Sequence, residues 1–174
     1  MTRHTHRLRW AGLSLATAAA FLSGCAAPAK VDYTAFRQAK PASILVLPPV
    51  NNSPDVNATF SVLSQATYPL AEAGYYVLPV ALVAETFHQN GLSTPADMHA
   101  VGPAKLKDIF GADAALYIKV TQYGSKYMVL SSAAVVTAEA QLVDLSTGTR
   151  LWSGTASASS DEGGNNSGGG LAGL

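Results

Sequence analysis

Cys25 carries the only thiol of the chain, and it lies at the end of a segment with the composition of a secretory signal. Three arginines precede a largely apolar run of about 12 residues from Trp10 to Phe21, and small residues then lead to the cysteine. This order of basic, apolar and small residues is that of a signal peptide. A transmembrane anchor with an incidental cysteine is the alternative, but a bilayer-spanning helix needs about 20 apolar residues.

The four residues Leu22-Ser23-Gly24-Cys25 resemble the lipobox of bacterial lipoproteins. The resemblance implies that the Cys25 thiol receives a diacylglyceryl group, that cleavage removes residues 1–24, and that the new amine is acylated too. Several acyl chains, at about 0.8 kcal/mol per buried CH₂, make detachment from a membrane very slow. Ala26, rather than an aspartate, follows the cysteine, and this predicts sorting to the outer membrane.

Removal of the signal changes the charge of the chain. Three of the 11 basic residues and none of the 11 acidic residues lie in residues 1–24, so the mature chain has a net charge of −3. This charge argues against nucleic acid as a partner. With Cys25 acylated, no thiol remains for a disulfide, a thiolate metal site or a cysteine nucleophile.

Other residues with catalytic potential are scattered along the chain. His88 and His99 are the only histidines after the signal, and they do not form a His-Glu-x-x-His pair. No Gly-x-Ser-x-Gly motif occurs, and the Gly-rich residues 163–170 lack the Lys-Ser/Thr of a phosphate-binding loop. We therefore expect no catalytic residue, no metal site and no cofactor besides the lipid on Cys25, and the protein is predicted not to be an enzyme.

Tyrosines provide the candidate interface, which consists of Tyr117, Tyr123 and Tyr127. They cluster around a predicted hairpin, and strict alternation puts Tyr117 and Tyr123 opposite the apolar face that contains Ile118. Amphipathic rings on the wetter face of a sheet can form a contact surface. Packing of these rings beneath helices, or singly on the surface, is the open alternative.

The pattern of the chain predicts a signal, a tether, one domain and a tail. Tyr33 and Phe36 lie in the tether and could dock on the domain. The tail is rich in Gly, Ser and Asn and is expected to be flexible because it has little apolar surface to bury. The four parts are residues 1–24, 25–42, 43–158 and 159–174.

The first half of the domain has helical periodicity, and the second half alternates with period two. An antiparallel meander is predicted there, with tight turns at Gly124-Ser125 and at residues 144–148. The expected fold is α/β, a single-domain layer sandwich of the order βαβαα followed by the meander on a mixed sheet. The predicted earlier elements are a strand at 43–47, a helix capped by Ser53, a strand at 75–78, a helix from Pro79 and, after a polar connection, a helix from Pro103. The predicted core residues are Leu47, Phe60, Ile109, Ile118 and Leu142.

Several phrases of the sequence resemble the bacterial lipoprotein family of domain of unknown function 799, the meningococcal lipoprotein antigen type. The resemblance extends from the lipobox to about Ala158. It implies an α/β domain distantly similar to the TolB amino-terminal domain and to curli-secretion lipoproteins, and it supplies no catalytic residue. Family members continue through the Gly-rich stretch into another apolar helix, whereas this sequence ends at Leu174, which suggests a short protein or a truncated sequence. The phrases are 48–56, 68–77, 90–92, 110–114, 144–145 and 151–154.

These observations favour a periplasm-facing outer-membrane lipoprotein that acts as a non-catalytic binding or assembly component of an envelope transport or secretion system. Its expected partners are the membrane and other envelope proteins, with a curli-type secretion lipoprotein or a second copy of the chain among the options. Two alternatives stay open: an envelope hydrolase acting on peptidoglycan or lipid, and a structural surface antigen.

Overall fold

The computed structural model describes residues 31–128 and 131–160. The predicted signal peptide 1–24, the lipidation residue Cys25 and residues 161–174 of the predicted tail lie outside the described residues. Within the described part of the chain, no helix has the length and apolar character needed to cross a membrane.

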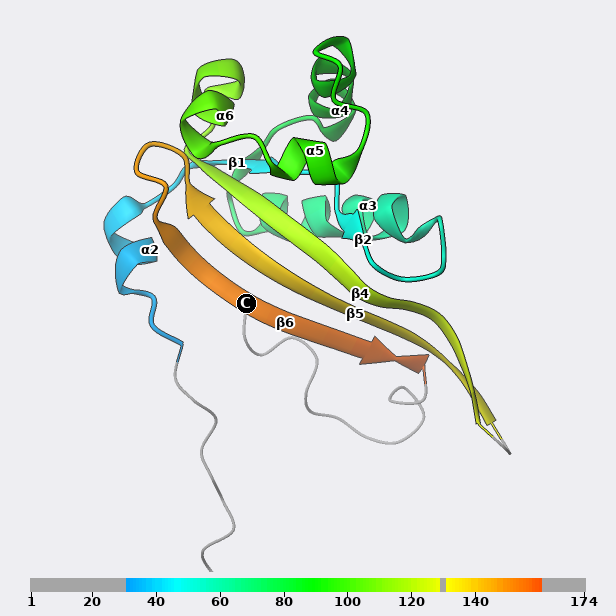
Figure 1. Ribbon diagram of the computed structural model, residues 1–174. Helices are drawn as coiled ribbons and strands as arrows, with labels where there is room; N and C mark the ends of the chain where they lie inside the picture. The colour runs from blue at the N-terminus through cyan, green and yellow to red at the C-terminus, as the bar shows by residue number, and fades with distance from the viewer. Residues whose placement is uncertain (1–30, 129–130, 161–174) are drawn as a thin grey trace, which may run out of the picture. The chain divides into compact units, whose positions relative to one another are not determined.

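A mixed sheet with the strand order β3-β1-β4-β5-β6 forms the centre of the domain, and the short β2 also pairs with β4 (Figure 1). β1 is parallel to both β3 and β4, whereas β4, β5 and β6 are antiparallel neighbours. This confirms the predicted α/β fold with a mixed sheet. The strands are β1 (Ser43–Val46), β2 (Val50–Asn51), β3 (Tyr76–Val77), β4 (Ala114–Met128), β5 (Ser131–Asp144) and β6 (Arg150–Ser159).

Helices cover both faces of the sheet near β1. α4, α5 and α6 pack around Leu45 and Leu47, whereas α2 and α3 pack around Ile44 and Val46. β1 is therefore buried on both sides, which explains why its apolar residues do not alternate with polar ones. The helices are α2 (Thr34–Ala39), α3 (Ala58–Glu72), α4 (Val80–Gln89), α5 (Pro95–His99) and α6 (Pro103–Phe110).

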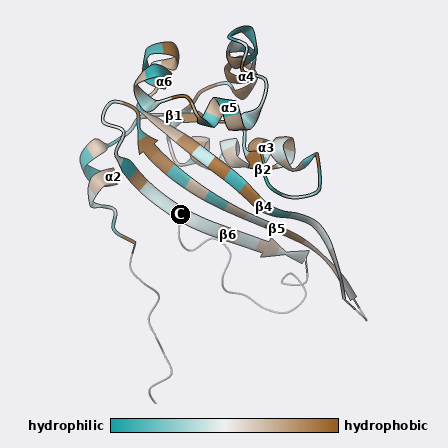
Figure 2. Ribbon diagram, viewed as in Figure 1, coloured by the Kyte–Doolittle hydropathy of each residue, from teal (hydrophilic) through white to brown (hydrophobic). Residues whose placement is uncertain are grey.

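The antiparallel strands β4, β5 and β6 form a long ribbon that runs beyond the helices (Figure 1). Hydrophobic and hydrophilic residues alternate along β4 where the helices cover it (Figure 2). The predicted tight turn at Gly124-Ser125 is wrong, because Gly124 pairs with Val135 inside the ribbon. The predicted turn after Asp144 is confirmed, since the Asp144 carboxylate accepts hydrogen bonds from the N–H groups of Ser146 and Thr147, both at 2.8 Å.

The start of α3 also differs from the prediction. Ser53 is not its N-cap but lies in a loop closed by Asn51, whose Oδ1 accepts hydrogen bonds from the Ser53 N–H and hydroxyl at 2.8 and 2.7 Å. The Asn51 amide also donates to the Asp55 carbonyl at 2.7 Å. Because these bonds keep residues 51–55 out of a helix, α3 begins only at Ala58.

Three of the five predicted core residues are buried and two are not. Phe60 is 73% exposed, because α3 turns Leu63 toward the sheet instead. Ile109 is 40% exposed, because α6 packs on its core cluster through Leu106 and, at the margin, Phe110. The buried residues are Leu47, Ile118 and Leu142.

Part of the stretch predicted to be a tether is folded. Residues 34–39 form α2, and Phe36 packs on the core cluster of the α3 face. The Phe36 ring meets the Tyr75 ring edge-on, with centroids 6.5 Å apart. The expected docking of Phe36 on the domain is thereby confirmed, and the folded part begins before Ser43.

Candidate binding site

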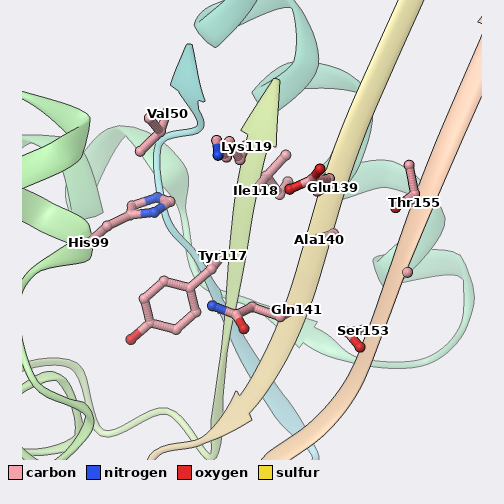
Figure 3. A pocket seen from close by; sticks show the side chains of 11 residues that line it. Val50, His99, Tyr117, Ile118, Lys119, Glu139, Ala140, Gln141, Ser153 and Thr155 are labelled. Carbon is pink, nitrogen blue, oxygen red and sulfur yellow. The ribbon is translucent and has the colours of Figure 1, made fainter. Parts of the chain in front are cut away.

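A shallow groove of about 450 Å³ lies on the polar face of the β4–β6 ribbon, beside α5 and β2. Tyr117 and Lys119 enter it from β4, Glu139 and Gln141 from β5, and Thr155 from β6 (Figure 3). We call this feature the sheet groove. Apart from the half-buried Tyr117, these side chains are exposed.

Strand register explains why these side chains meet. Tyr117 pairs with Gln141 and Lys119 with Glu139, and Thr155 of β6 lies opposite Glu139. Directly opposite residues in an antiparallel sheet project to the same face, so these five side chains come from odd-numbered positions on all three strands. The opposite charges of Lys119 and Glu139 suit this pairing.

α5 supplies one wall of the groove. Thr94 caps the helix by accepting a hydrogen bond from the Asp97 N–H at 3.2 Å, and Pro95 occupies the first turn. Met98 anchors the helix in the core at 2% exposure. The next residue, His99, is thereby directed toward β4.

His99 and Tyr117 form the aromatic part of the groove (Figure 3). Their ring centroids are 5.3 Å apart with an interplanar angle of 86°. His99 Nε2 lies 3.0 Å from the Pro48 carbonyl oxygen, which only accepts hydrogen bonds, so Nε2 carries the proton. Burial lowers the pKa of His99 below its ordinary value of 6.5 against the opposing effect of that hydrogen bond, and burial raises the pKa of Tyr117.

This electrostatic arrangement suits binding by hydrogen bonds and ring contacts. At neutral pH the imidazole is neutral, so Nδ1 can accept a hydrogen bond, and the phenol keeps its proton. Lys119 and Glu139 add one charge of each sign further along the groove. Among residues 31–128 and 131–160, no three His, Cys, Asp or Glu side chains are placed to hold a metal ion.

The three predicted interface tyrosines do not share one surface. Tyr117 lies in the sheet groove and packs against the core cluster of the α4–α6 face. A bulge between Val120 and Gln122 shifts the register, so Tyr123 pairs with Val136, an even-numbered β5 position. Tyr123 therefore points to the face opposite Tyr117, and the expectation that they share a face is wrong.

Tyr127 continues β4 toward the end of the ribbon, where its backbone pairs with Ser132. Its side chain and Cys25 both lie outside what the structure describes. The sequence did not point to His99 as part of a site, since α5 fell in a stretch that was predicted to be a polar connection. The Thr94-Pro95 sequence was the available signal, because it is typical of a helix start.

Comparisons with known proteins identify a matching family and a crystal structure that agrees with this fold. The family described as "Putative lipoprotein GNA1162-like" matches residues 31–174. The crystal structure of lipoprotein GNA1162 from Neisseria meningitidis is 56% identical, with a TM-score of 0.65, and the match covers 73% of this chain and 88% of that one. The C-terminal domain of LpoB from Salmonella enterica is 21% identical, with a TM-score of 0.48, over 67% of this chain and 82% of that one.

A longer relative comes from Neisseria meningitidis serogroup B (strain ATCC BAA-335 / MC58) and is described as "Putative lipoprotein NMB1124/NMB1162". It is 60% identical over 142 residues, which are 82% of this chain and 65% of the relative. This chain therefore spans less than two thirds of the length of that relative.

Proposed function

Because the chain belongs to the GNA1162-like lipoprotein family, we propose that it is a lipid-anchored, non-catalytic binding or assembly component of a bacterial envelope transport or secretion system. The family predicted from the sequence is the family found. Cys25 is the lipid attachment residue in this proposal, and the domain faces the periplasm from the outer membrane.

The sheet groove is the observation that carries the binding role. It offers polar strand side chains, the neutral His99–Tyr117 pair and the opposite charges of Lys119 and Glu139, a mixture typical of protein contact surfaces. An open groove of about 450 Å³ on a three-stranded ribbon suits a loop or an extended segment of a partner protein. A second copy of this chain and a curli-type secretion lipoprotein are the partners that the proposal names.

Site-specific photocrosslinking in the cell envelope tests this role. A benzophenone side chain at Gln141, which is exposed in the groove, should crosslink to one partner of defined mass. The matched control is the same group at Ile109, which is 40% exposed on α6 and outside the groove. Equal crosslinking at both positions, or none at Gln141, would refute the groove as the contact surface.

The hydrolase alternative is tested on the same purified protein. Incubation with peptidoglycan or phospholipid vesicles should release no soluble fragments or fatty acids. Release of fragments or fatty acids that is lost when His99, the half-buried histidine of the groove, is substituted would support a catalytic role instead of a binding role. Digestion of the protein by a protease added to intact cells would instead support the surface-antigen alternative.

A further inference from the structure

The outward face of α3 has an unusual composition for a helix in contact with water. Phe60 and Tyr68, eight residues apart, are 73% and 66% exposed, and Val56 just before the helix is 82% exposed. The only charged residue within the helix is its last one, Glu72. A surface helix of a soluble domain ordinarily carries charged side chains on the face turned away from the core.

Three polar side chains of α3 donate hydrogen bonds within their own helix. The Ser64 hydroxyl donates to the Ser61 carbonyl at 2.8 Å, and the Thr67 hydroxyl donates to the Ser64 carbonyl at 3.3 Å. The Tyr68 hydroxyl donates to Glu72 Oε1 at 2.6 Å. These internal bonds lower the cost of removing the helix surface from water.

The chain length between the predicted anchor and the domain limits how far the domain can lie from the membrane. Seven residue steps separate Cys25 from Asp32, and a chain of that length spans at most about 25 Å. The first folded element after Asp32 is α2, whose Phe36 packs on the same core cluster as Leu63 of α3. α2 and α3 thus pack on one face of the sheet. A membrane that holds the Cys25 lipid therefore lies within about 25 Å of Asp32, just before the start of α2, on chain length alone.

We propose that the outward face of α3 docks on the phospholipid surface in which Cys25 is anchored, with Phe60 and Tyr68 in the interfacial layer. This inference rests on the lipid anchor of the proposed function. Aromatic rings favour the interface between headgroups and acyl chains. A membrane contact made by so few side chains is weak by itself. The lipid anchor raises the local concentration of the domain at the membrane and so makes the contact persistent.

This orientation has a consequence for the sheet groove. The groove lies on the face of α5, and α3 covers the opposite face of the sheet. With α3 on the lipid, the groove opens away from the membrane. Because the α3 face is nearly uncharged, the contact needs no anionic lipid and should tolerate salt.

Tryptophan quenching by brominated lipid tests the orientation on the anchored protein. The lipoprotein with Phe60→Trp is reconstituted into phosphatidylethanolamine–phosphatidylcholine vesicles with brominated acyl chains, and its added emission should be quenched and shifted to shorter wavelength. Leu82→Trp is the matched control, because Leu82 is 65% exposed on α4, on the opposite face of the sheet. Trp152 contributes the same background to both variants.

Each outcome decides the proposal. Quenching of Phe60→Trp but not of Leu82→Trp supports the proposed orientation. The orientation is overturned if only Leu82→Trp is quenched, if both variants are quenched equally, or if neither is quenched although the protein is attached to the vesicles. Failure of all variants to float with the vesicles is instead a failure of the lipid anchor. In that case, a chain that begins at Cys25 can be attached to the vesicles by coupling its thiol to a maleimide lipid. The quenching of Phe60→Trp and Leu82→Trp is then compared again to test the orientation.

Discussion

His99 of α5 stands edge-on to Tyr117 of β4, at 5.3 Å and 86°, while its Nε2 donates to the carbonyl of Pro48 in the connection from β1 to β2. One imidazole therefore joins three segments that are far apart in the sequence. The contact fixes the wall of the sheet groove, so the protonation of His99 should affect both the groove and the stability of the fold.

The first prediction concerns this histidine and pH. Burial holds the pKa of His99 below its ordinary value of 6.5, so the unfolded chain binds more protons than the folded one just below that pH. Stability should therefore fall as pH decreases from about 7 toward 5 and stop falling once the folded state is protonated as well. Melting temperatures should show this slope in the wild type and a flatter one in His99→Gln. His88→Gln, at an exposed position, should keep the wild-type slope.

The second prediction concerns Asp113, which ties β1 to the start of β4. Its Oδ2 accepts hydrogen bonds from the Ser43 hydroxyl and N–H at 2.9 and 3.0 Å and from the Ala42 N–H at 3.1 Å. Asp113→Asn should cost about 1–2 kcal/mol of unfolding free energy in urea, because hydrogen bonds to a charged, partly exposed acceptor are lost or weakened. Lys107→Ala removes the partly exposed ion pair with Asp113 at 3.2 Å and an exposed hydrogen bond to the Gly111 carbonyl at 3.3 Å. It should cost less than about 1 kcal/mol of unfolding free energy.

The same carboxylate predicts an acid transition. The hydrogen bond from the Ser43 side chain, with smaller contributions from Ala42 and Lys107, holds the pKa of Asp113 below 3.8. Its stabilisation is therefore complete above pH 3.8 and is lost as pH falls through the folded-state pKa. This window lies below that of His99, so the two effects can be separated in one titration. If the wild type and Asp113→Asn lose stability in parallel below pH 3.8, the assignment of this transition to the Asp113 carboxylate is wrong.

The third prediction compares two isoleucines that the sequence placed in the core. Ile118 is 5% exposed beneath the α3 face, and Ile109 is 40% exposed on α6. Ile118→Ala should cost about 2–5 kcal/mol through lost contacts and a cavity, whereas Ile109→Ala should cost well under half of that. Similar values for the two variants in urea unfolding would mean that the strand or helix faces are assigned incorrectly.

These isoleucines also show what sequence patterns can and cannot predict here. Alternation in β4 correctly placed Ile118, because Leu116, Ile118 and Val120 are all buried on one side of that part of the strand. Helical spacing alone could not choose between Ile109 and Leu106, since adjacent turns offer several apolar faces and tertiary packing decides which one is covered. The loop at Asn51 moved the start of α3 by side-chain hydrogen bonds, which periodicity does not detect.

The bulge after Val120 limits prediction of the candidate site in the same way. One extra residue in β4 reverses the faces of all later side chains, and its position depends on the partner strand rather than on local composition. The sequence thus identified Tyr117 and Tyr123 as neighbours in an alternating strand but could not place them on opposite faces. It identified the strand positions of Lys119 and Glu139 without showing that α5 closes a groove beside them.

The fourth prediction concerns the anchor, which lies outside the described residues. Cys25→Ser removes the acyl acceptor, so the protein should lose lipid labelling and either remain uncleaved or become mislocalised. Wild-type protein should label with fatty acid and appear in outer-membrane fractions at the mature size. Normal fractionation of the variant at that size would refute the lipoprotein assignment, and wild type in inner-membrane fractions would refute the sorting prediction.

The last prediction uses the opposite directions of two tyrosines on β4. If the sheet groove binds a partner or a second copy, Tyr117→Ser should weaken association about tenfold or more, since buried aromatic residues at contact centres are worth about 2 kcal/mol or more. Tyr123→Ser should leave association unchanged, because the bulge turns Tyr123 to the other face. Crosslinking and sedimentation measure association, and circular dichroism with melting temperature controls for folding. Weakened association in both variants would place the contact at the edge or end of the ribbon instead of in the groove. A collapse of the melting temperature in Tyr117→Ser alone would assign that ring to the core, and the exposed Lys119→Glu variant would then decide whether the groove binds at all.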